Sequence, residues 1–284
     1  MPELPEVEVL VRHLAPLIQN QTIRKVEVRR ARVIAPTLES ELQHQLVQAK
    51  FTGLTRRGKY LLFELTSKGD KTPKVVVGHL GMTGRMYLQP AKSALPKHSA
   101  VVLDLGRSKL IFEDTRYFGR FTLDKTGISK LGPEPLGPDF TVDYFLTELK
   151  RSSQAIKVKL LDQTLVAGIG NIYASEALFR AGVSPRVAAN RLKRRQVTVL
   201  WQAMHEVLIA AITSGSTLPL DFAGIGGNDG LFYYGTAGSE SGFYRERLLV
   251  YDRRDQPCPN CQTPIRRIIQ AARSTFFCPF CQRQ

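Results

Sequence analysis

No stretch of the sequence reaches the roughly 18 consecutive apolar residues that a membrane-spanning helix needs. The N-terminus also lacks a basic segment followed by an apolar run, the pattern of a secretory signal peptide. We therefore predict a cytoplasmic protein without a membrane partner. Cysteine is absent before position 258, and cytoplasmic thiols stay reduced, so a fold built around disulfides is excluded.

Acidic residues are also in short supply. The chain of 284 residues has 25 Asp and Glu against 40 Lys and Arg, which gives a net charge of +15. Such an excess favours a polyanionic partner, with nucleic acid first and an anionic membrane surface second. A protein that is merely basic is the alternative. The length predicts two domains with a small appended module.

The four cysteines all lie in the last 27 residues, with the spacing C-x2-C-x16-C-x2-C. This spacing is typical of a zinc site with four thiolate ligands, whereas two disulfides would need an oxidising compartment. Four thiolates leave no open coordination position, so we predict one structural Zn²⁺. The intervening TPIRRIIQAARSTFF predicts a β-hairpin whose basic edge is suited to phosphates. The predicted ligands are Cys258, Cys261, Cys278 and Cys281.

Hydrophobic spacing changes along the chain. Residues 5–18 repeat apolar side chains at helical intervals and predict a helix that ends near Pro16. From residue 22 to about 130, short β-rich runs between turn residues predict an antiparallel sandwich or barrel. Three prolines and two glycines in residues 131–140 predict a linker, and helical spacing follows over 141–213.

Two internal segments carry a weaker signal of nucleic-acid binding. In 154–185, two helices flank a turn with Gly168 and Gly170, which can direct backbone amides toward a phosphate. In EDTRYFGRF, residues 113–121, arginines beside an aromatic residue have the composition of a wedge that enters a duplex and replaces an everted base. An ordinary turn and a hairpin with a packed phenylalanine are the respective alternatives.

The chain begins MPELPEVE, with a proline directly after the initiator methionine. Removal of Met1 would give Pro2 a free secondary amine. An α-amine has a pKa of about 7.7–8.0, so part of the population is neutral and nucleophilic near neutral pH. Glu3 beside it is a candidate proton carrier. A frayed terminus without chemistry is the alternative.

Together these segments resemble one family, the formamidopyrimidine-DNA glycosylases. MPELPEVE, TRRGKYLL, HLGMTG, the D-x-R-x-F-G segment, LGPEPL, LVAGIGNIYASEALF and the C-terminal cysteine ribbon occur in family order and cover nearly the whole chain. The resemblance implies an α+β multidomain fold with an N-terminal antiparallel β-sandwich, a helical helix–two-turn–helix domain and a zinc-ribbon hairpin. The implied domains are 1–132 for the catalytic sandwich, 133–140 for the linker, 141–248 for the helical domain with a lesion-recognition loop, and 249–284 for the ribbon.

The resemblance also implies an enzyme of base-excision repair. It would be a bifunctional DNA glycosylase and AP lyase that removes oxidised purines, namely 8-oxoguanine and formamidopyrimidines, from double-stranded DNA and also acts at abasic sites. The proline nitrogen would attack the sugar C1′, and the resulting Schiff base would permit β- and then δ-elimination. A monomer associated with the bacterial nucleoid is the implied state.

The family's catalytic positions match residues of this chain. Pro2 matches the nucleophile, Glu3 the general acid and Glu6 a supporting carboxylate. Lys59 matches the lysine of β-elimination and phosphate binding, and Arg273 matches the ribbon arginine of phosphate binding and δ-elimination.

The implied DNA contacts form a second set. Met82, Arg116 and Phe118 match the trio that fills the gap left by the flipped base, and Lys157 matches a lysine near the damaged base. The full set of matched DNA contacts is His79, Met82, His98, Arg116, Phe118, Lys157 and Asn171.

Three features depart from the family pattern. Tyr117 stands where the family usually has a second basic residue. Ser152 stands where a phosphate-contacting lysine is common, although the two residues before it are basic. The glycine-rich, aperiodic residues 221–244 predict a flexible loop that is longer than usual, in the region that closes over the damaged base. These departures leave the lesion preference open but not the covalent chemistry.

Three other assignments compete with this one. An endonuclease VIII-type glycosylase prefers oxidised pyrimidines, but its typical start is PEGPE rather than PELPE. A DNA-binding protein that has lost activity would not need the catalytic set, yet all of that set is present here. An RNA-binding or ribosome-bound zinc-ribbon protein would explain the charge but not the N-terminal segment.

Overall fold

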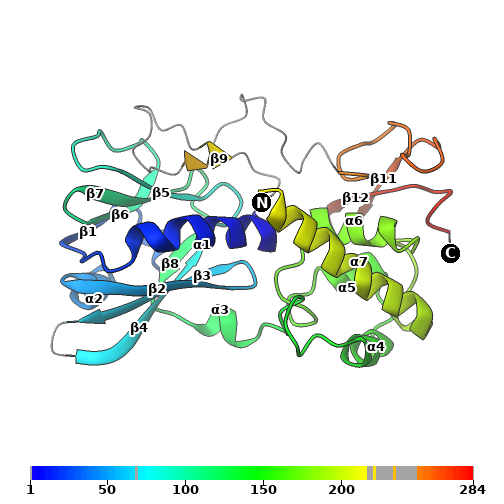
Figure 1. The fold of residues 1–284 in the computed structure, drawn as a ribbon, viewed down its shortest axis with the longest axis horizontal. Coiled ribbons are helices and arrows are strands. Elements are labelled where there is room, and N and C mark those ends of the chain that lie inside the picture. The colour runs from blue at the N-terminus through cyan, green and yellow to red at the C-terminus, as the bar shows by residue number, and fades with distance from the viewer. Residues whose placement is uncertain (1, 68–69, 216–219, 222–232, 235–247, 284) are drawn as a thin grey trace. The chain divides into compact units, whose positions relative to one another are not determined.

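The computed structural model describes residues 2–67, 70–215, 220–221, 233–234 and 248–283 (Figure 1). The chain divides into two compact units. Unit 1 is built mainly from residues up to Ser129, and unit 2 from Lys130 to Ser214 together with the C-terminal segment.

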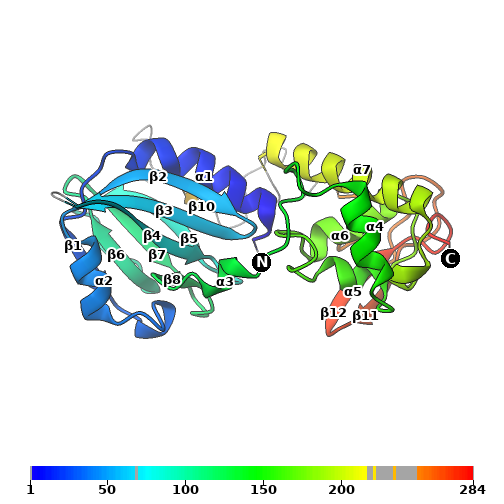
Figure 2. The ribbon, with the colours of Figure 1, turned by 90° about the horizontal axis from the view of Figure 1, so that it is seen from below.

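Unit 1 is an antiparallel β-sandwich, as the sequence predicts. Its strands are β1 (Lys25–Val28), β2 (Ala49–Arg57), β3 (Tyr60–Ser67), β4 (Asp70–His79), β5 (Arg85–Pro90), β6 (Ser99–Asp104), β7 (Ser108–Glu113) and β8 (Arg120–Thr122). They form two four-stranded sheets with the orders β1-β6-β7-β5 and β2-β3-β4-β8 (Figures 1 and 2). Alternate residues of β3, such as Leu61 and Phe63, point into one apolar core that they share with Met86 and Val101 of the other sheet.

Helix α1 (Leu4–Ile18) packs its apolar face, including Val7, Leu10 and Leu14, into the same core. The sequence predicts that this helix ends near Pro16, and it ends two residues later, at Ile18. Pro16 has no backbone N–H, so it removes one hydrogen bond, but it lies in the last turn, where only two more residues follow it in the helix. The N–H of Gln19 still donates to the carbonyl of Ala15 at 3.0 Å.

Shorter elements complete unit 1. They are η1 (Ala31–Val33), α2 (Glu39–Leu46) and α3 (Thr126–Ser129). Most of the loop predicted at 221–244 lies outside the described residues. In the part that the structure describes, β9 (Leu220–Asp221) pairs antiparallel with β10 (Tyr233–Tyr234).

Unit 2 contains the predicted helices and the predicted hairpin. Its elements are α4 (Val142–Lys150), α5 (Ile156–Leu160), α6 (Asn171–Arg180), η2 (Ala189–Arg191), α7 (Arg194–Thr213), β11 (Arg266–Gln270) and β12 (Arg273–Phe277). The indole N–H of Trp201 on α7 donates to the carbonyl of Phe140 at 2.6 Å, so the proline-rich segment packs against this unit. Among the described helices, none has the length and apolarity needed to cross a membrane.

Candidate nucleic-acid interface and metal centre

The first turn of α1 holds two buried carboxylates. Glu3 is the N-cap of α1, and its backbone N–H donates to Glu6 Oε2 at 2.7 Å, within a capping box. Glu3 is 2% exposed and Glu6 is 1% exposed, and Pro2 is buried as well. The capping box therefore fixes the path of the chain at Pro2 and holds both carboxylates beside it.

The hairpin between β2 and β3 carries Lys59. Gly58 has φ +56° in this turn, a conformation that favours glycine. Arg56 links the hairpin to α1 through an ion pair with Glu8 at 2.8 Å, and Arg56 also donates to the carbonyl of Gly58 at 3.0 Å. This bracing places the buried Lys59 on an element directly attached to the first turns of α1.

His79 ends β4 opposite Tyr60, the residue after Lys59. Burial, assisted by the charges of Lys59 and Arg120, lowers the pKa of His79 to about 4. The backbone N–H of Gly81 donates to His79 Nδ1 at 3.1 Å. His79 is therefore neutral near pH 7, with its remaining proton on Nε2, where it can donate to a ligand.

The predicted wedge residues come from two loops that meet at Asp114. This fully buried carboxylate accepts hydrogen bonds from Thr83 Oγ1 at 2.6 Å and from the backbone N–H of Gly119 at 2.8 Å. The loops approach so closely that a Cβ on Gly81, which has φ +61°, would lie 2.6 Å from Gly119 N. Asp114 thus joins HLGMTG to the wedge loop, which we define as residues 114–119.

The trio itself is exposed on this surface. Met82 is 46% exposed and Phe118 is 42% exposed, although both are large apolar side chains. Arg116 places its guanidinium carbon 4.7 Å from the centroid of the Phe118 ring. The structure therefore brings these three residues into one region. His98 adjoins them, since its Nδ1 lies 3.4 Å from the hydroxyl of Tyr117.

Unit 2 links the remaining predicted residues. The buried Lys157 donates from Nζ to Asn171 Oδ1 at 2.6 Å, and Asn171 Nδ2 donates to the carbonyl of Ser274 at 2.8 Å. Arg273 precedes Ser274 and is exposed at the start of β12. Three elements, α5, α6 and the ribbon hairpin, are thereby locked together around these side chains.

The four cysteines converge as a zinc site requires. Their sulfur atoms lie within 4.8 Å of one another, with 3.8 Å between Cys258 and Cys281 and 3.5 Å between Cys261 and Cys278. A tetrahedral ion with Zn–S bonds of about 2.3 Å would separate its ligands by about 3.8 Å. The donor set therefore fits one structural zinc ion.

The cysteine thiols of the ribbon differ in the direction in which their pKa is shifted. Hydrogen bonding to Thr263 lowers the pKa of Cys261 to about 6, whereas burial raises the pKa of Cys281. Adjacent thiolates repel one another, and a divalent cation at their centre removes that repulsion. Gln282 braces the site, because it accepts from the Cys278 N–H at 2.9 Å and donates to the carbonyl of Val183 at 3.0 Å.

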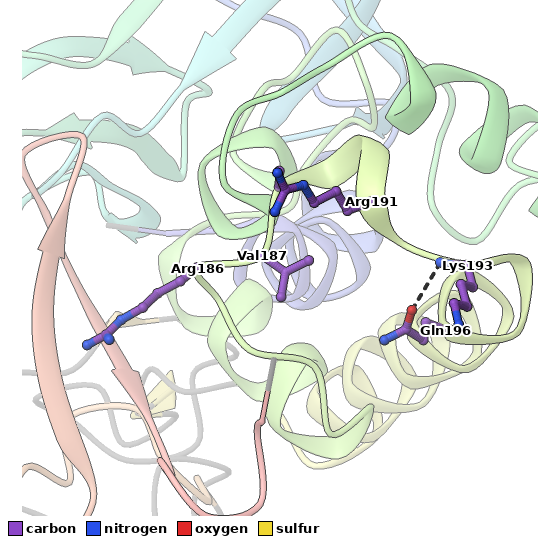
Figure 3. Close-up of a pocket in the computed structure, with 6 residues that line it drawn as sticks. Arg186, Val187, Arg191, Lys193 and Gln196 are labelled. Atoms are coloured by element: carbon purple, nitrogen blue, oxygen red, sulfur yellow. Dashed lines mark hydrogen bonds between the residues drawn. The ribbon is translucent and has the colours of Figure 1, made fainter.

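Unit 2 also carries a basic hollow of about 570 Å³ (Figure 3). Its lining residues are Arg186, Val187, Ala188, Arg191, Lys193 and Gln196. The basic side chains spread apart in Figure 3 rather than converge on one point. The hollow thus adds positive charge to unit 2 without forming a defined site.

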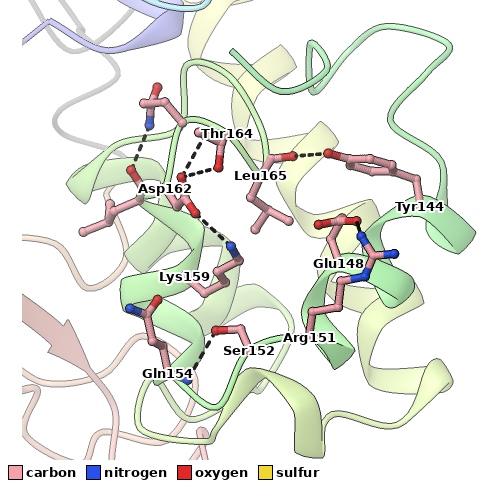
Figure 4. Close-up of polar contacts among 11 residues, drawn as sticks. Tyr144, Glu148, Arg151, Ser152, Gln154, Lys159, Asp162, Thr164 and Leu165 are labelled. Carbon is pink, nitrogen blue, oxygen red and sulfur yellow. Dashed lines mark hydrogen bonds and ion pairs between the residues drawn. The ribbon is translucent and has the colours of Figure 1, made fainter. Parts of the chain in front are cut away.

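Lys150 and Arg151, the two basic residues before Ser152, differ in whether their side chains are available to a phosphate. Ser152 Oγ accepts from the backbone N–H of Gln154 at 3.3 Å, and Arg151 forms an ion pair with Glu148 at 2.6 Å (Figure 4). Lys150 Nζ donates to the carbonyls of Asn190 and Leu192 at 2.7 and 2.9 Å. Lys150 therefore supports the fold, while the side chain of Arg151 remains 70% exposed.

Sequence reasoning missed three positioning residues. Asp114 is the first residue of the D-x-R-x-F-G segment, so the motif itself could have indicated it. Glu176 lies inside the apolar IYASEALF helix, where a buried acid is unusual enough to be a signal. Gln282 follows the last cysteine and has no comparable signal in the sequence.

Comparisons with known proteins agree with this arrangement. Residues 1–121 match the formamidopyrimidine-DNA glycosylase N-terminal domain, and residues 131–220 match the H2TH domain of the same enzymes. Residues 255–284 match a zinc finger found in FPG and IleRS. Formamidopyrimidine-DNA glycosylase from Carboxydothermus hydrogenoformans is 38% identical, with 100% of each chain covered. The chain belongs to the formamidopyrimidine-DNA glycosylase family.

Other members of the family support the same assignment. The enzyme from a Synechococcus species is 41% identical, with 99% of each chain covered. A crystal structure of Lactococcus lactis formamidopyrimidine-DNA glycosylase, noncovalently bound to DNA with an AP site, has a TM-score of 0.85 and 31% identity over 99% of this chain and 100% of that one. A structure of MutM with DNA that contains carbocyclic 8-oxo-G has a TM-score of 0.86 and 33% identity over 100% of both chains. As a formamidopyrimidine-DNA glycosylase, the chain is an enzyme of base-excision repair, and AP lyase activity is a feature of its family.

Proposed function

We propose that this chain removes oxidised purines from double-stranded DNA and then cuts the strand at the resulting abasic site. The solved relatives bind DNA that contains an 8-oxoguanine analogue, a formamidopyrimidine or an abasic site, which supports this substrate class. The observation that carries the proposal is the proline at position 2, beside two carboxylates that the first turn of α1 holds buried.

The proposed chemistry begins with the Pro2 amine after removal of Met1. Its nitrogen attacks C1′ of the damaged nucleotide, the bond from C1′ to the base breaks, and the base departs with a proton. Glu3 assists by protonating the ring oxygen of the sugar, and Glu6 holds the backbone of Glu3 in place. The resulting iminium acidifies C2′, so loss of a proton there expels the 3′ phosphate, and a second elimination expels the 5′ phosphate.

Charged residues would hold the DNA during these steps. Lys59 and Arg273 are proposed to bind phosphates and to assist the eliminations, and the trio on the wedge loop and HLGMTG is proposed to fill the gap in the duplex. His79, His98, Lys157 and Asn171 are proposed as further contacts. The proposed domains are 1–132, 133–140, 141–248 and 249–284. The proposed state is a monomer that acts on the chromosome in the bacterial cytoplasm.

Borohydride trapping on a duplex with 8-oxoguanine opposite cytosine tests the proposal. Reduction of the iminium should join DNA to the protein, and mass spectrometry should place the adduct on the N-terminal peptide at Pro2. Absence of an adduct with both this duplex and abasic DNA, despite tight binding, would favour a DNA-binding protein without activity.

Pro2→Gly separates nucleophilicity from binding. Glycine keeps a terminal amine but changes its geometry and basicity, so binding should stay close to that of the wild type. Single-turnover base release should slow by on the order of 10²-fold, the scale of losing one positioned catalytic group. An unchanged single-turnover rate would rule out Pro2 as the nucleophile.

A further inference from the structure

Two arginines from η1 and its N-cap lie over the aromatic residues of the wedge loop. The guanidinium carbon of Arg30 is 5.1 Å from the centroid of the Tyr117 ring, and that of Arg32 is 5.6 Å from the centroid of the Phe118 ring. These distances are within the range of cation–π attraction. The wedge loop therefore receives positive charge from a segment more than 80 positions earlier in the sequence.

Tyr117 is held in place rather than free. Its φ is +53°, a left-handed conformation that disfavours a bulky residue, so the surroundings must compensate. On one side its hydroxyl lies 3.4 Å from His98 Nδ1, and on the other its ring faces Arg30. The ring can thus act as a platform that orients the guanidinium.

Most N–H donors of the Arg30 guanidinium are not engaged by the residues around it. It is exposed, and one of its N–H groups donates to the carbonyl of Arg29 at 2.8 Å. Within the described part of the chain, no carboxylate pairs with it. A guanidinium has five N–H donors in a planar fork that suits a phosphate, so most of them remain available to a ligand.

Arg30 therefore presents exposed N–H donors beside the wedge loop, with its guanidinium against the Tyr117 ring. We propose that Arg30, oriented by the Tyr117 ring, is a DNA-positioning residue that binds a backbone phosphate beside the wedge. The inference rests on the proposed function, since it assumes that this surface of unit 1 faces DNA.

The test measures binding to a duplex that carries a tetrahydrofuran abasic analogue opposite cytosine, by fluorescence anisotropy over a series of salt concentrations. Arg30→Ala should weaken binding about five- to tenfold and reduce the slope of log K against log salt by about 0.9, the value for one phosphate contact. Arg29→Ala is the matched control. It removes the same charge one position away, but Arg29 lies near Glu27 (3.5 Å), so its effect should stay below about twofold.

The Tyr117 variants test the coupling. Tyr117→Ala should lose about as much affinity as Arg30→Ala, and the double variant should lose little more than either single variant, because both changes remove one contact. Tyr117→Arg in the Arg30→Ala background should recover affinity and salt slope, since it restores a charge on the loop. Thermal unfolding of Arg30→Ala and Arg29→Ala should match the wild type, because both side chains are exposed. The Tyr117 variants lose a partly buried ring that packs against the core, so they should unfold at a lower temperature, and binding is compared where all variants are folded.

The outcomes separate the two proposals. Wild-type protein that does not prefer the abasic duplex to undamaged DNA would overturn the proposed function and this inference together. Wild-type preference with equal effects of Arg30→Ala and Arg29→Ala would overturn the inference alone. A loss of affinity without a change in salt slope, or without recovery by Tyr117→Arg, would also overturn it, because either result indicates packing rather than a phosphate contact.

Discussion

Buried charged residues position the exposed ones in both units. Asp114 and Lys157 are each 0% exposed, and both have hydrogen-bond partners on other elements. Burying a charge without partners is strongly unfavourable, so these side chains fix the geometry of everything bonded to them. The exposed wedge and the Asn171 amide are consequences of those buried bonds, and neither would keep its orientation without them.

His79 gives the clearest pH dependence at this scale. In the unfolded chain a histidine takes up a proton below about pH 6.5, whereas folded His79 does so only near its pKa of about 4. Between these values the unfolded state binds more protons, so the free energy of unfolding falls as the pH falls. The loss totals about 3 kcal/mol by pH 4. His79→Asn should remove this contribution. The difference in the free energy of unfolding between variant and wild type, measured with urea, should therefore change by about 3 kcal/mol between pH 7 and pH 4.

Lys59→Gln tests the cause of the low pKa of His79. Burial is the largest cause of the low pKa of His79, and the charge of Lys59 adds to it. Removing that charge should raise the pKa of His79 part of the way toward 6.5, as an NMR titration of the imidazole would show. A His79 pKa near 6.5 in the wild type would contradict the half-buried, neutral histidine described above.

Among the elements, helix α6 has a structural role that its sequence motif does not indicate. Glu176 on this helix is buried, and its carboxylate accepts from the backbone N–H groups of Leu249, Val250 and Tyr251 at 2.8 to 3.0 Å. Burial raises the pKa of Glu176, while the three N–H donors oppose that change. The helix therefore anchors the chain where it enters the zinc ribbon.

Removing this anchor should destabilise unit 2. Glu176→Gln keeps one acceptor oxygen and should reduce the free energy of unfolding by about 1–3 kcal/mol, the cost of leaving a buried donor unsatisfied, and Glu176→Ala should reduce it further. Trp201 is the single tryptophan and lies in unit 2, so its fluorescence during urea unfolding reports this loss. Glu206→Gln is the control. Its exposed pairing with Arg180 at 3.6 Å should contribute less than about 0.5 kcal/mol. Equal effects of the two Gln variants would refute the anchoring role.

Elements with an uninterrupted pattern were predictable from the sequence, and those with a broken pattern were not. Strand β2 gives a weak signal in the sequence, because a bulge between Phe51 and Gly53 breaks the alternation of buried residues. Helix α2 gives a weak signal as well, because it is eight residues long and buries only Leu42 and Leu46. The ribbon hairpin, by contrast, was predictable because the cysteine pairs bracket it.

The same contrast holds for the candidate site at the scale of the molecule. The cysteine spacing is local in sequence and alone indicated zinc, whereas the N-terminal segment indicated a nucleophile only through its resemblance to the family. Contacts such as Thr83 with Asp114, or Arg30 with Tyr117, join residues 31 to 87 positions apart. No local pattern reports such a contact, because it depends on which strands pair and on how the loops between them approach.

Two units with separate cores imply that metal loss and loss of the sandwich are separate events. Chelation of zinc should release the four thiolates and unfold the ribbon, since a structural zinc site supplies folding free energy directly. The exposed Arg273 and the bond from Asn171 to Ser274 depend on that hairpin, so DNA binding should be lost. Among the residues that the structure describes, the core of unit 1 contains none from the ribbon, so its β-sheet circular dichroism and thermal transition should persist. A chelator titration that follows anisotropy on the abasic duplex and circular dichroism in parallel checks this, and added zinc should restore binding. Loss of both signals at the same chelator concentration would show instead that the sandwich depends on the metal.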